Sequence, residues 1–99
     1  MATVLFSRKK SLNGYIITLC DKDLYGKTIK DKGIEFKINN FYKGDELCTN
    51  DIKKGDFENV ISIHAIGENS VNLLVNLGII SKDDIKYFGD IPIVLIFYV

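Results

Sequence analysis

Residues 60–78, VISIHAIGENSVNLLVNLG, decide how this chain folds. β-Branched apolar residues dominate positions 60–66, which predicts a strand with at least one covered face. Gly67 ends that run, and apolar residues then recur at helical spacing. Gly78 is expected to stop the helix in the left-handed C′ conformation. The stretch therefore predicts a buried strand that leads directly into a helix from Glu68 to Leu77.

The composition predicts one globular domain. Of the 99 residues, 46% are apolar and 26% are charged, which argues against disorder. We expect a single α+β domain over residues 1–99. Its sheet should be mostly antiparallel or mixed, with five to six strands packed with one main helix and short helical turns. The apolar run at 91–99 is much shorter than the roughly 20 residues of a membrane helix, so no membrane partner is expected.

Cys20 and Cys48 are the two cysteines, and neither lies in a C-x-x-C pair. The N-terminal segment MATVLFSRKK lacks a small-residue cleavage site, so we expect a cytoplasmic protein with free thiols. The cysteines, the single histidine and the carboxylates show no spacing typical of metal ligands. The sequence therefore predicts no metal and no cofactor.

Shorter elements are expected around the central unit. Apolar and charged residues alternate in Ile34–Ile38, which predicts a half-exposed strand. Ser81–Asp84 matches a capping box, and Gly89-Asp90 predicts a hairpin between strands at 85–88 and 91–99. The other expected elements are strands at 3–6 and 15–20, a helical turn at 21–25, a charged connector at 28–33, an aromatic turn at 41–44 and a short helix at 49–57.

Two stretches have partial features of phosphate-binding sites. Gly26-Lys27-Thr28 matches the end of a P-loop, but that motif needs a glycine where this chain has Asp21. A negative charge there would repel a phosphate, so nucleotide hydrolysis is not expected. The turn at Gly67 could hold an anion on free N–H groups, yet Glu68 competes for the same position. A packed turn is the simpler interpretation.

His64 is the only histidine, and it lies in an apolar strand. Such a residue is most often a hydrogen-bonded core or rim residue, but with Asp21 and Glu68 it could form a general-base group. Cys20 would need a neighbouring base to act as a nucleophile, and no spacing brings it to His64. Structural roles are the default for these residues.

Positive charge is concentrated in the first half of the chain. Residues 1–43 carry nine Lys or Arg and four Asp or Glu, whereas residues 44–99 carry four and nine. This asymmetry indicates either a nucleic-acid face or two halves that attract each other. In the first case we expect RNA as the partner. The expected phosphate contacts are Arg8, Lys9, Lys10, Lys27 and Lys30, and the expected stacking residues are Tyr25 or Tyr42.

Four short motifs together resemble the archaeal domain-of-unknown-function family 424. They are C-D-x-x-L-x-G-K-T at 20–28, F-Y-x-G at 41–44, G-E-x-x-V at 67–71 and G-x-x-P at 89–92. The resemblance implies a small archaeal cytoplasmic protein of a family that has been labelled RNA-binding without an established activity. Its matching positions of unknown role are Cys20, Asp21, Gly26, Lys27, Phe41, Tyr42, Gly44, Gly67 and Glu68.

This chain also departs from the family pattern. The family has an asparagine at or beside the position of His64, and a His and a Gln after the proline, where Pro92 is followed here by Ile93, Val94 and Leu95. If those polar residues line a family site, this chain has lost part of it.

Three functions are compatible with these observations. The first is an RNA-binding module linked to translation or RNA processing. The second is a protein-interaction or assembly module, in which the C-terminal strand or another sheet edge pairs with a partner or with a second copy. The third is a small enzyme, which requires Asp21, His64 and Glu68 to meet in one pocket.

Overall fold

The computed structural model describes residues 2–98 and confirms an α+β fold. Its strands are β1 (Thr3–Ser11), β2 (Gly14–Asp21), β3 (Thr28–Asp31), β4 (Ile34–Lys37), β5 (Asp45–Cys48), β6 (Val60–Ile66), β7 (Lys86–Phe88) and β8 (Ile91–Phe97). The α-helix α1 spans Glu68–Asn76, and short 3₁₀ helices cover Lys22–Leu24 (η1), Asn40–Tyr42 (η2), Thr49–Asp51 (η3), Lys54–Phe57 (η4) and Lys82–Asp84 (η5).

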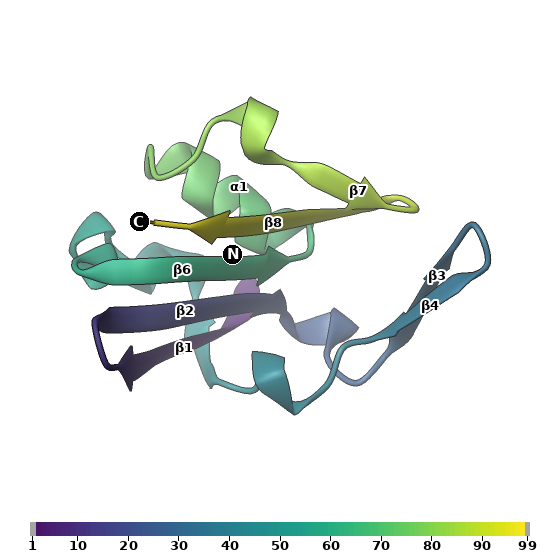
Figure 1. The fold of residues 1–99 in the computed structure, drawn as a ribbon, viewed down its shortest axis with the longest axis horizontal. Coiled ribbons are helices and arrows are strands. Elements are labelled where there is room, and N and C mark those ends of the chain that lie inside the picture. Colours follow the sequence, from purple (N-terminus) through teal and green to yellow (C-terminus); the bar gives the residue numbers. More distant parts are fainter. Residues whose placement is uncertain (1, 99) are drawn as a thin grey trace.

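Six strands form one mixed sheet in the order β5-β1-β2-β6-β8-β7. Only the β2–β6 pair is parallel, and the other neighbours are antiparallel. Figure 1 shows α1 behind this sheet, where it covers one face. The prediction of a mixed sheet of up to six strands with one main helix is therefore confirmed.

The predicted strand and helix at the centre are confirmed as β6 and α1. Gly67 separates them with a φ of 108°, a conformation that favours glycine, and its N–H donates to the carbonyl of Pro92. Gly78 follows the helix with a φ of 74°, as expected for C′. The apolar side of α1 packs on the sheet residues Val4, Ile17, Leu19, Ile63, Ala65 and Val94.

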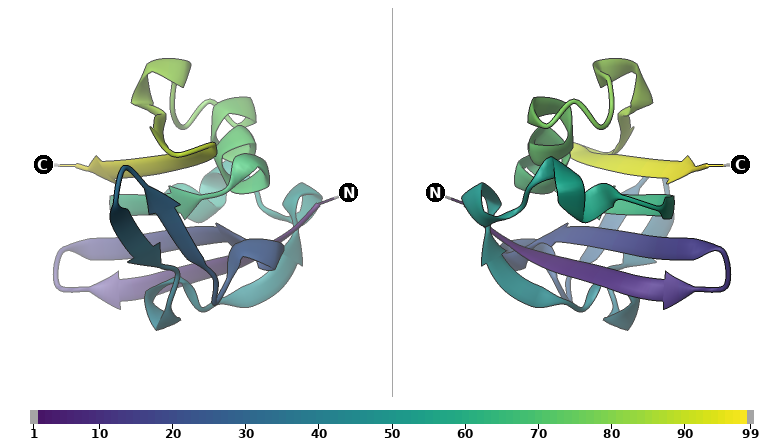
Figure 2. Two further views of the ribbon diagram at one scale, coloured as in Figure 1. Left: turned by 90° about the vertical axis from the view of Figure 1, so that its right-hand side faces the viewer. Right: turned by 90° about the vertical axis from the view of Figure 1, so that its left-hand side faces the viewer.

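The prediction of a charged connector at 28–33 is wrong. Residues 28–31 form β3, which pairs with β4 as a separate two-stranded sheet. Ile29 lies between the polar residues Thr28 and Lys30, and it is 9% exposed because the hairpin packs on the end of the main sheet. Figure 2 shows this hairpin crossing in front of the main sheet when the molecule is viewed from that end. A smaller core, which includes Leu5, Cys20 and Ile66, lies beneath it.

Three other expectations change in detail. The first strand is longer than predicted, because the polar segment up to Ser11 continues the pairing with β2. β5 was not predicted, and it pairs with the start of β1. The helix expected at 49–57 is two 3₁₀ helices, because Ile52 between them adopts an extended conformation that buries its side chain.

The C-terminal expectations are confirmed. Ser81 N–H donates to the Asp84 carboxylate at 2.9 Å, which forms the predicted capping box. β7 and β8 then pair across the two-residue turn. β8 ends at Phe97, and Val99, the last residue of the predicted strand, lies outside the described residues. Among residues 2–98, no helix combines the length and the apolar character that crossing a bilayer would require.

Candidate functional site

The face of the main sheet opposite α1 is only partly covered, and we call it the open face. Side chains alternate between the two faces of a strand, so residues next to the core positions Ile17, Ile63 and Val94 point away from the helix. The register aligns these residues in rows across the strands. The open face carries Ser7, Lys9, Ile16, Thr18, Ser62, His64, Leu95 and Phe97.

Three aromatic rings form a ladder across the open face. The rings of Phe41 and His64 are 4.9 Å apart, and those of His64 and Phe97 are 5.8 Å apart. Both pairs meet edge to face, at 86° and 85°. Phe97 is 66% exposed and Phe41 is 41% exposed, so large parts of both rings face solvent. We call these three residues the aromatic ladder.

His64 is the central residue of the aromatic ladder. A hydrogen bond of 3.1 Å joins its Nε2 to Ser62 Oγ on the same strand. Partial burial lowers the pKa of His64, because the protonated ring would lose hydration. The neutral imidazole is therefore favoured at pH 7, and it extends the apolar surface between the two phenylalanines.

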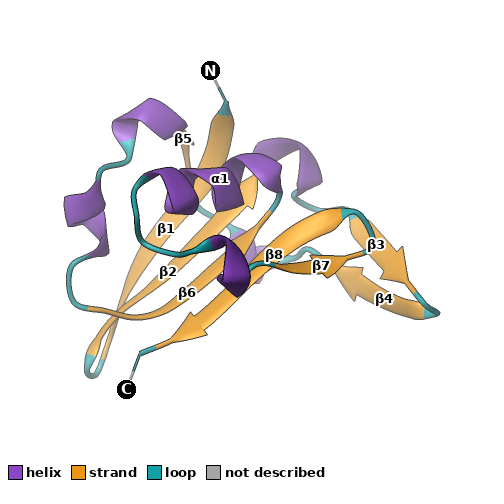
Figure 3. Cartoon of the chain, turned by 90° about the horizontal axis from the view of Figure 1, so that it is seen from above, coloured by secondary structure: helices purple, strands orange, loops and turns teal. Residues whose placement is uncertain are grey.

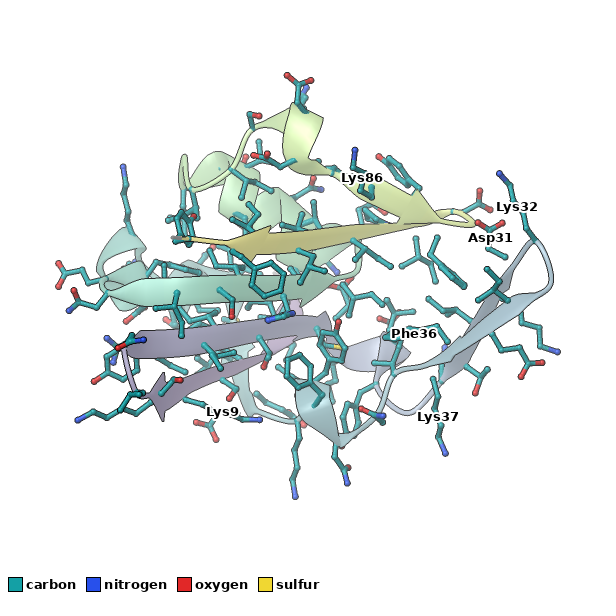
Figure 4. The ribbon with its side chains drawn as sticks, in the orientation of Figure 1. Lys9, Asp31, Lys32, Phe36, Lys37 and Lys86 are labelled. Atoms are coloured by element: carbon teal, nitrogen blue, oxygen red, sulfur yellow. The ribbon has the colours of Figure 1, made fainter. Side chains whose placement is uncertain are left out.

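A cavity of about 210 Å³ adjoins the aromatic ladder. Phe36 reaches it from β4, on the side that faces the main sheet, whereas Lys37 points away (Figure 4). The ring of Phe36 lies 6.4 Å from that of Tyr42 and 6.3 Å from that of Phe88. These contacts hold the β3–β4 hairpin against the sheet and give the cavity apolar walls.

The predicted basic residues do not form one patch. Lys9 lies on the open face, with its Nζ 5.7 Å from the centre of the Phe41 ring. Arg8 lies on the other face, where its guanidinium stacks on Tyr15 at 3.4 Å and donates to a backbone carbonyl. Lys30 pairs with Glu35 at 3.3 Å on the hairpin. Lys10 and Lys27 are exposed at the β1–β2 turn and at the base of that hairpin.

The tyrosines predicted to stack on bases are engaged within the protein. Tyr42 is 8% exposed, and its ring contacts Phe36 and Phe41, so it offers no free face. Burial, with a smaller contribution from Cys20, raises the pKa of Tyr42. The hydroxyl of Tyr25 donates to Asn40 Oδ1 at 3.0 Å. Tyr42 therefore has no ring face available to a base, whereas its neighbour Phe41 is 41% exposed.

Asp21, the last residue of β2, caps the N-terminus of α1, although α1 follows β6 in the chain. Its carboxylate accepts hydrogen bonds from the N–H of Asn69 at 3.1 Å and from the N–H and the hydroxyl of Ser70, both at 2.8 Å. A Cβ at Gly67 would lie 2.3 Å from the carboxylate carbon. This carboxylate occupies the helix N-terminus where an external anion was considered.

The three residues of the enzyme hypothesis do not meet. Asp21 is bound to the start of α1, whereas His64 lies on the open face, on the other side of the sheet. Glu68 is exposed on the helix. Cys20 is fully buried, and burial together with Asp21 and Asp23 raises its pKa to about 12. It remains a thiol rather than a nucleophilic thiolate.

No metal site is evident in the described range 2–98, where no three His, Cys, Asp or Glu side chains are grouped to hold an ion.

Several motif positions have packing roles. A Cβ at Gly44 would lie 2.4 Å from the carbonyl oxygen of Phe6, so only glycine lets this segment cross β1. Gly26 has a φ of 84°, and its N–H donates to the carbonyl of Ile38 at 2.8 Å. With Asp21 and Gly67, these residues fix the connections around the sheet. These four motif positions therefore have structural roles in the fold.

Sequence reasoning missed Phe97 as a site residue. Every residue from Ile91 to Phe97 is apolar, so no alternation indicates which side chains face solvent. Phe41 was identified only as a motif position and as part of the aromatic turn at 41–44. Both could have been identified from the number of aromatic residues in the sequence, because one short helix cannot bury all of their side chains.

The comparisons with known proteins give a family and a fold. No curated protein matches this chain. A crystal structure of an uncharacterized conserved protein from Methanopyrus kandleri matches with a TM-score of 0.84 and 28% sequence identity, over 97% of this chain and 91% of that one. The model of the family described as "Protein of unknown function (DUF424)" matches residues 10–99. The chain therefore belongs to the DUF424 family.

Proposed function

We propose that the protein binds single-stranded RNA on its open face, with bases stacked on the aromatic ladder. The observation that carries this proposal is the exposure of Phe41 and Phe97 on a sheet face beside a lysine. Sheet faces with exposed aromatic rings are a common platform for unpaired bases, since every base presents a π-face. Duplex RNA would not fit this role, because its bases are already stacked.

The stacking contribution sets the expected affinity. Base–aromatic stacking contributes about 1–3 kcal/mol per base. Phe97 is the most exposed ring of the aromatic ladder, followed by Phe41, and Leu95 is 56% exposed beside them. Two or three stacked bases and a few phosphate contacts favour micromolar rather than nanomolar binding.

The phosphate contacts would come from lysines at and around the open face. Lys9 lies on the face itself and Lys10 lies next to the β1–β2 turn. Lys27 lies at the base of the β3–β4 hairpin, and Lys30 lies within it, at the opposite end (Figure 1). Arg8 points to the other face of the sheet, where it stacks on Tyr15, so it is not one of the proposed phosphate contacts. Two or three contacts predict a slope of log K against log salt of about −1.4 to −2.1.

Fluorescence anisotropy with a labelled single-stranded RNA of mixed sequence tests this proposal. Phe97→Ala should weaken binding by about 5- to 100-fold, as expected for the loss of one stacking ring. Lys9→Glu should weaken binding and reduce the salt slope by about 0.7. The same RNA annealed to its complement should bind more weakly, because its bases are no longer available.

Two exposed residues away from the open face provide matched controls. Tyr87 is 66% exposed on β7, and Lys54 is exposed on η4. Tyr87→Ala and Lys54→Glu should leave the affinity within about twofold. Equal losses in Phe97→Ala and Tyr87→Ala, or no binding at low salt, would refute the proposal.

A further inference from the structure

The β3–β4 hairpin stands against the end of the main sheet where β7 turns into β8. Figure 3 shows the hairpin beside this end of the sheet, and β3 contacts β7. The cavity of about 210 Å³ described above lies at this junction, with walls from β4, η2, β6, β7 and β8. We call it the hairpin cavity, because it forms only where the hairpin folds back on the sheet.

The walls of the hairpin cavity are uncharged and mostly aromatic. Phe36, Tyr42 and Phe88 each contribute a ring, and Ile93 and Leu95 add aliphatic side chains. None of the described residues that line it is Lys, Arg, Asp or Glu. A phosphate or a carboxylate would lose its hydration here without gaining a charged partner, whereas a flat neutral ring can contact the aromatic walls. The chemistry of the walls therefore favours an uncharged aromatic ligand.

The hairpin cavity is open to solvent and keeps two polar groups. Phe36 and Leu95 are 36% and 56% exposed, so a ligand can enter beside them. His64 bonds Ser62 through Nε2, which leaves its Nδ1 without a hydrogen bond to residues 2–98. Tyr42 is 8% exposed, and its hydroxyl likewise has no hydrogen-bond partner within the described chain. A ligand whose edge carries donors and acceptors can satisfy both groups.

The size of the hairpin cavity selects among planar rings. An apolar cavity of about 150 Å³ in another protein holds a single benzene ring. The hairpin cavity, at about 210 Å³, has room for a ring system larger than benzene. A pyrimidine, which is the size of benzene, would leave part of the walls without contact atoms, and these lost contacts weaken its binding. A purine, with two fused rings and a polar edge, matches both the volume and the polar groups.

We propose that the hairpin cavity binds one purine base of the RNA that lies on the open face. This inference rests on the proposed function and adds a base preference to it, since stacking on exposed rings accepts any base. His64 connects the two parts of the site, because its ring belongs to the aromatic ladder and also lines the cavity. A base in the cavity and a base stacked on the ladder can therefore belong to neighbouring nucleotides of one strand.

Fluorescence anisotropy with two labelled pentanucleotides tests the preference. One is all uridine, and the other carries a single adenosine at its centre. The adenosine strand should bind about tenfold tighter, as expected for one more base held by aromatic contacts. Ile93→Phe places a ring in the cavity and should abolish this difference, while the all-uridine strand should keep its affinity within about twofold. Phe97→Ala should weaken both strands and keep the difference.

NMR with labelled methyl groups locates the base without relying on a variant. Adenosine should shift the methyl signals of Ile93 and Leu95, which line the cavity, and spare those of Val71 and Leu74, which lie in the core between α1 and the sheet. Cytidine at the same concentration should cause smaller shifts. A base of about ten non-hydrogen atoms has a Kd near the millimolar range at the efficiency of small ligands, so the titration extends to millimolar adenosine.

The outcomes separate this inference from the proposed function. A preference that is lost in Ile93→Phe and kept in Phe97→Ala would support the purine site. Equal binding of the two strands, a preference that survives Ile93→Phe, or adenosine shifts outside the cavity would overturn the purine site and leave stacking on the aromatic ladder in place. No binding of either strand at low salt would refute the proposed function, and the purine site with it. Circular dichroism verifies that both variants are folded.

Discussion

Replacing Asp21 with alanine tests the contact that joins the sheet to α1. The carboxylate is 5% exposed and accepts three hydrogen bonds, two of them from Ser70 at 2.8 Å. An N-cap contributes about 1 kcal/mol, with a range of roughly 0.5–2. In addition, the N–H of Ser70 is buried and would lose its partner, which costs about 1–3 kcal/mol. We expect Asp21→Ala to lower the free energy of unfolding by about 3 kcal/mol.

Urea unfolding followed by circular dichroism measures this change. The midpoint should fall while the slope with urea stays constant, because the surface exposed on unfolding is nearly unchanged. Ser70→Ala removes only the hydroxyl bond and should cost about 1 kcal/mol. Asp23 is exposed in the following turn, and Asp23→Ala should change stability by less than about 0.5 kcal/mol.

Two outcomes would refute this reasoning. A loss below about 1 kcal/mol in Asp21→Ala would mean that water or another group satisfies the start of α1. Similar losses of unfolding free energy in Asp21→Ala and Asp23→Ala would mean that negative charge in this region, rather than the hydrogen bonds of the cap, stabilises the protein.

Three further predictions concern packing and titration. Gly44→Ala should destabilise the protein by more than 2 kcal/mol in urea unfolding, because its Cβ would meet a β1 carbonyl, whereas Gly55→Ala faces open space and should be tolerated. In the native protein, a thiol reagent should modify the half-buried Cys48 and spare Cys20, whose pKa is raised to about 12, and urea should release the second thiol. The pKa of His64 is lowered in the fold, so the unfolded chain binds a proton first as the pH falls. The free energy of unfolding should therefore decline below about pH 6.5. This decline should be smaller in His64→Gln.

The central unit could be predicted because its local signals agree with its packing. β6 is apolar and β-branched, α1 has helical spacing, and Gly67 and Gly78 stand where positive φ is required. The capping box at Ser81 was equally readable, because its contacts span only three residues. In both cases the determinants lie close together in sequence.

The remaining strands depend on contacts that sequence spacing does not reveal. The polar end of β1 is a strand because β2 pairs with it up to Ser11, and β3 is a strand because β4 folds back onto it. Asp21 was expected only at the start of a helical turn at 21–25, but its side chain binds the start of α1, 48 and 49 residues away. Such long-range partners are set by the tertiary fold.

The candidate site shows the same division. Lysines and aromatic residues could be identified by type, but the face that each occupies depends on register. Arg8 and Lys9 are adjacent in sequence, yet the register of β1 sends them to opposite faces. Only Lys9 therefore contacts the aromatic ladder.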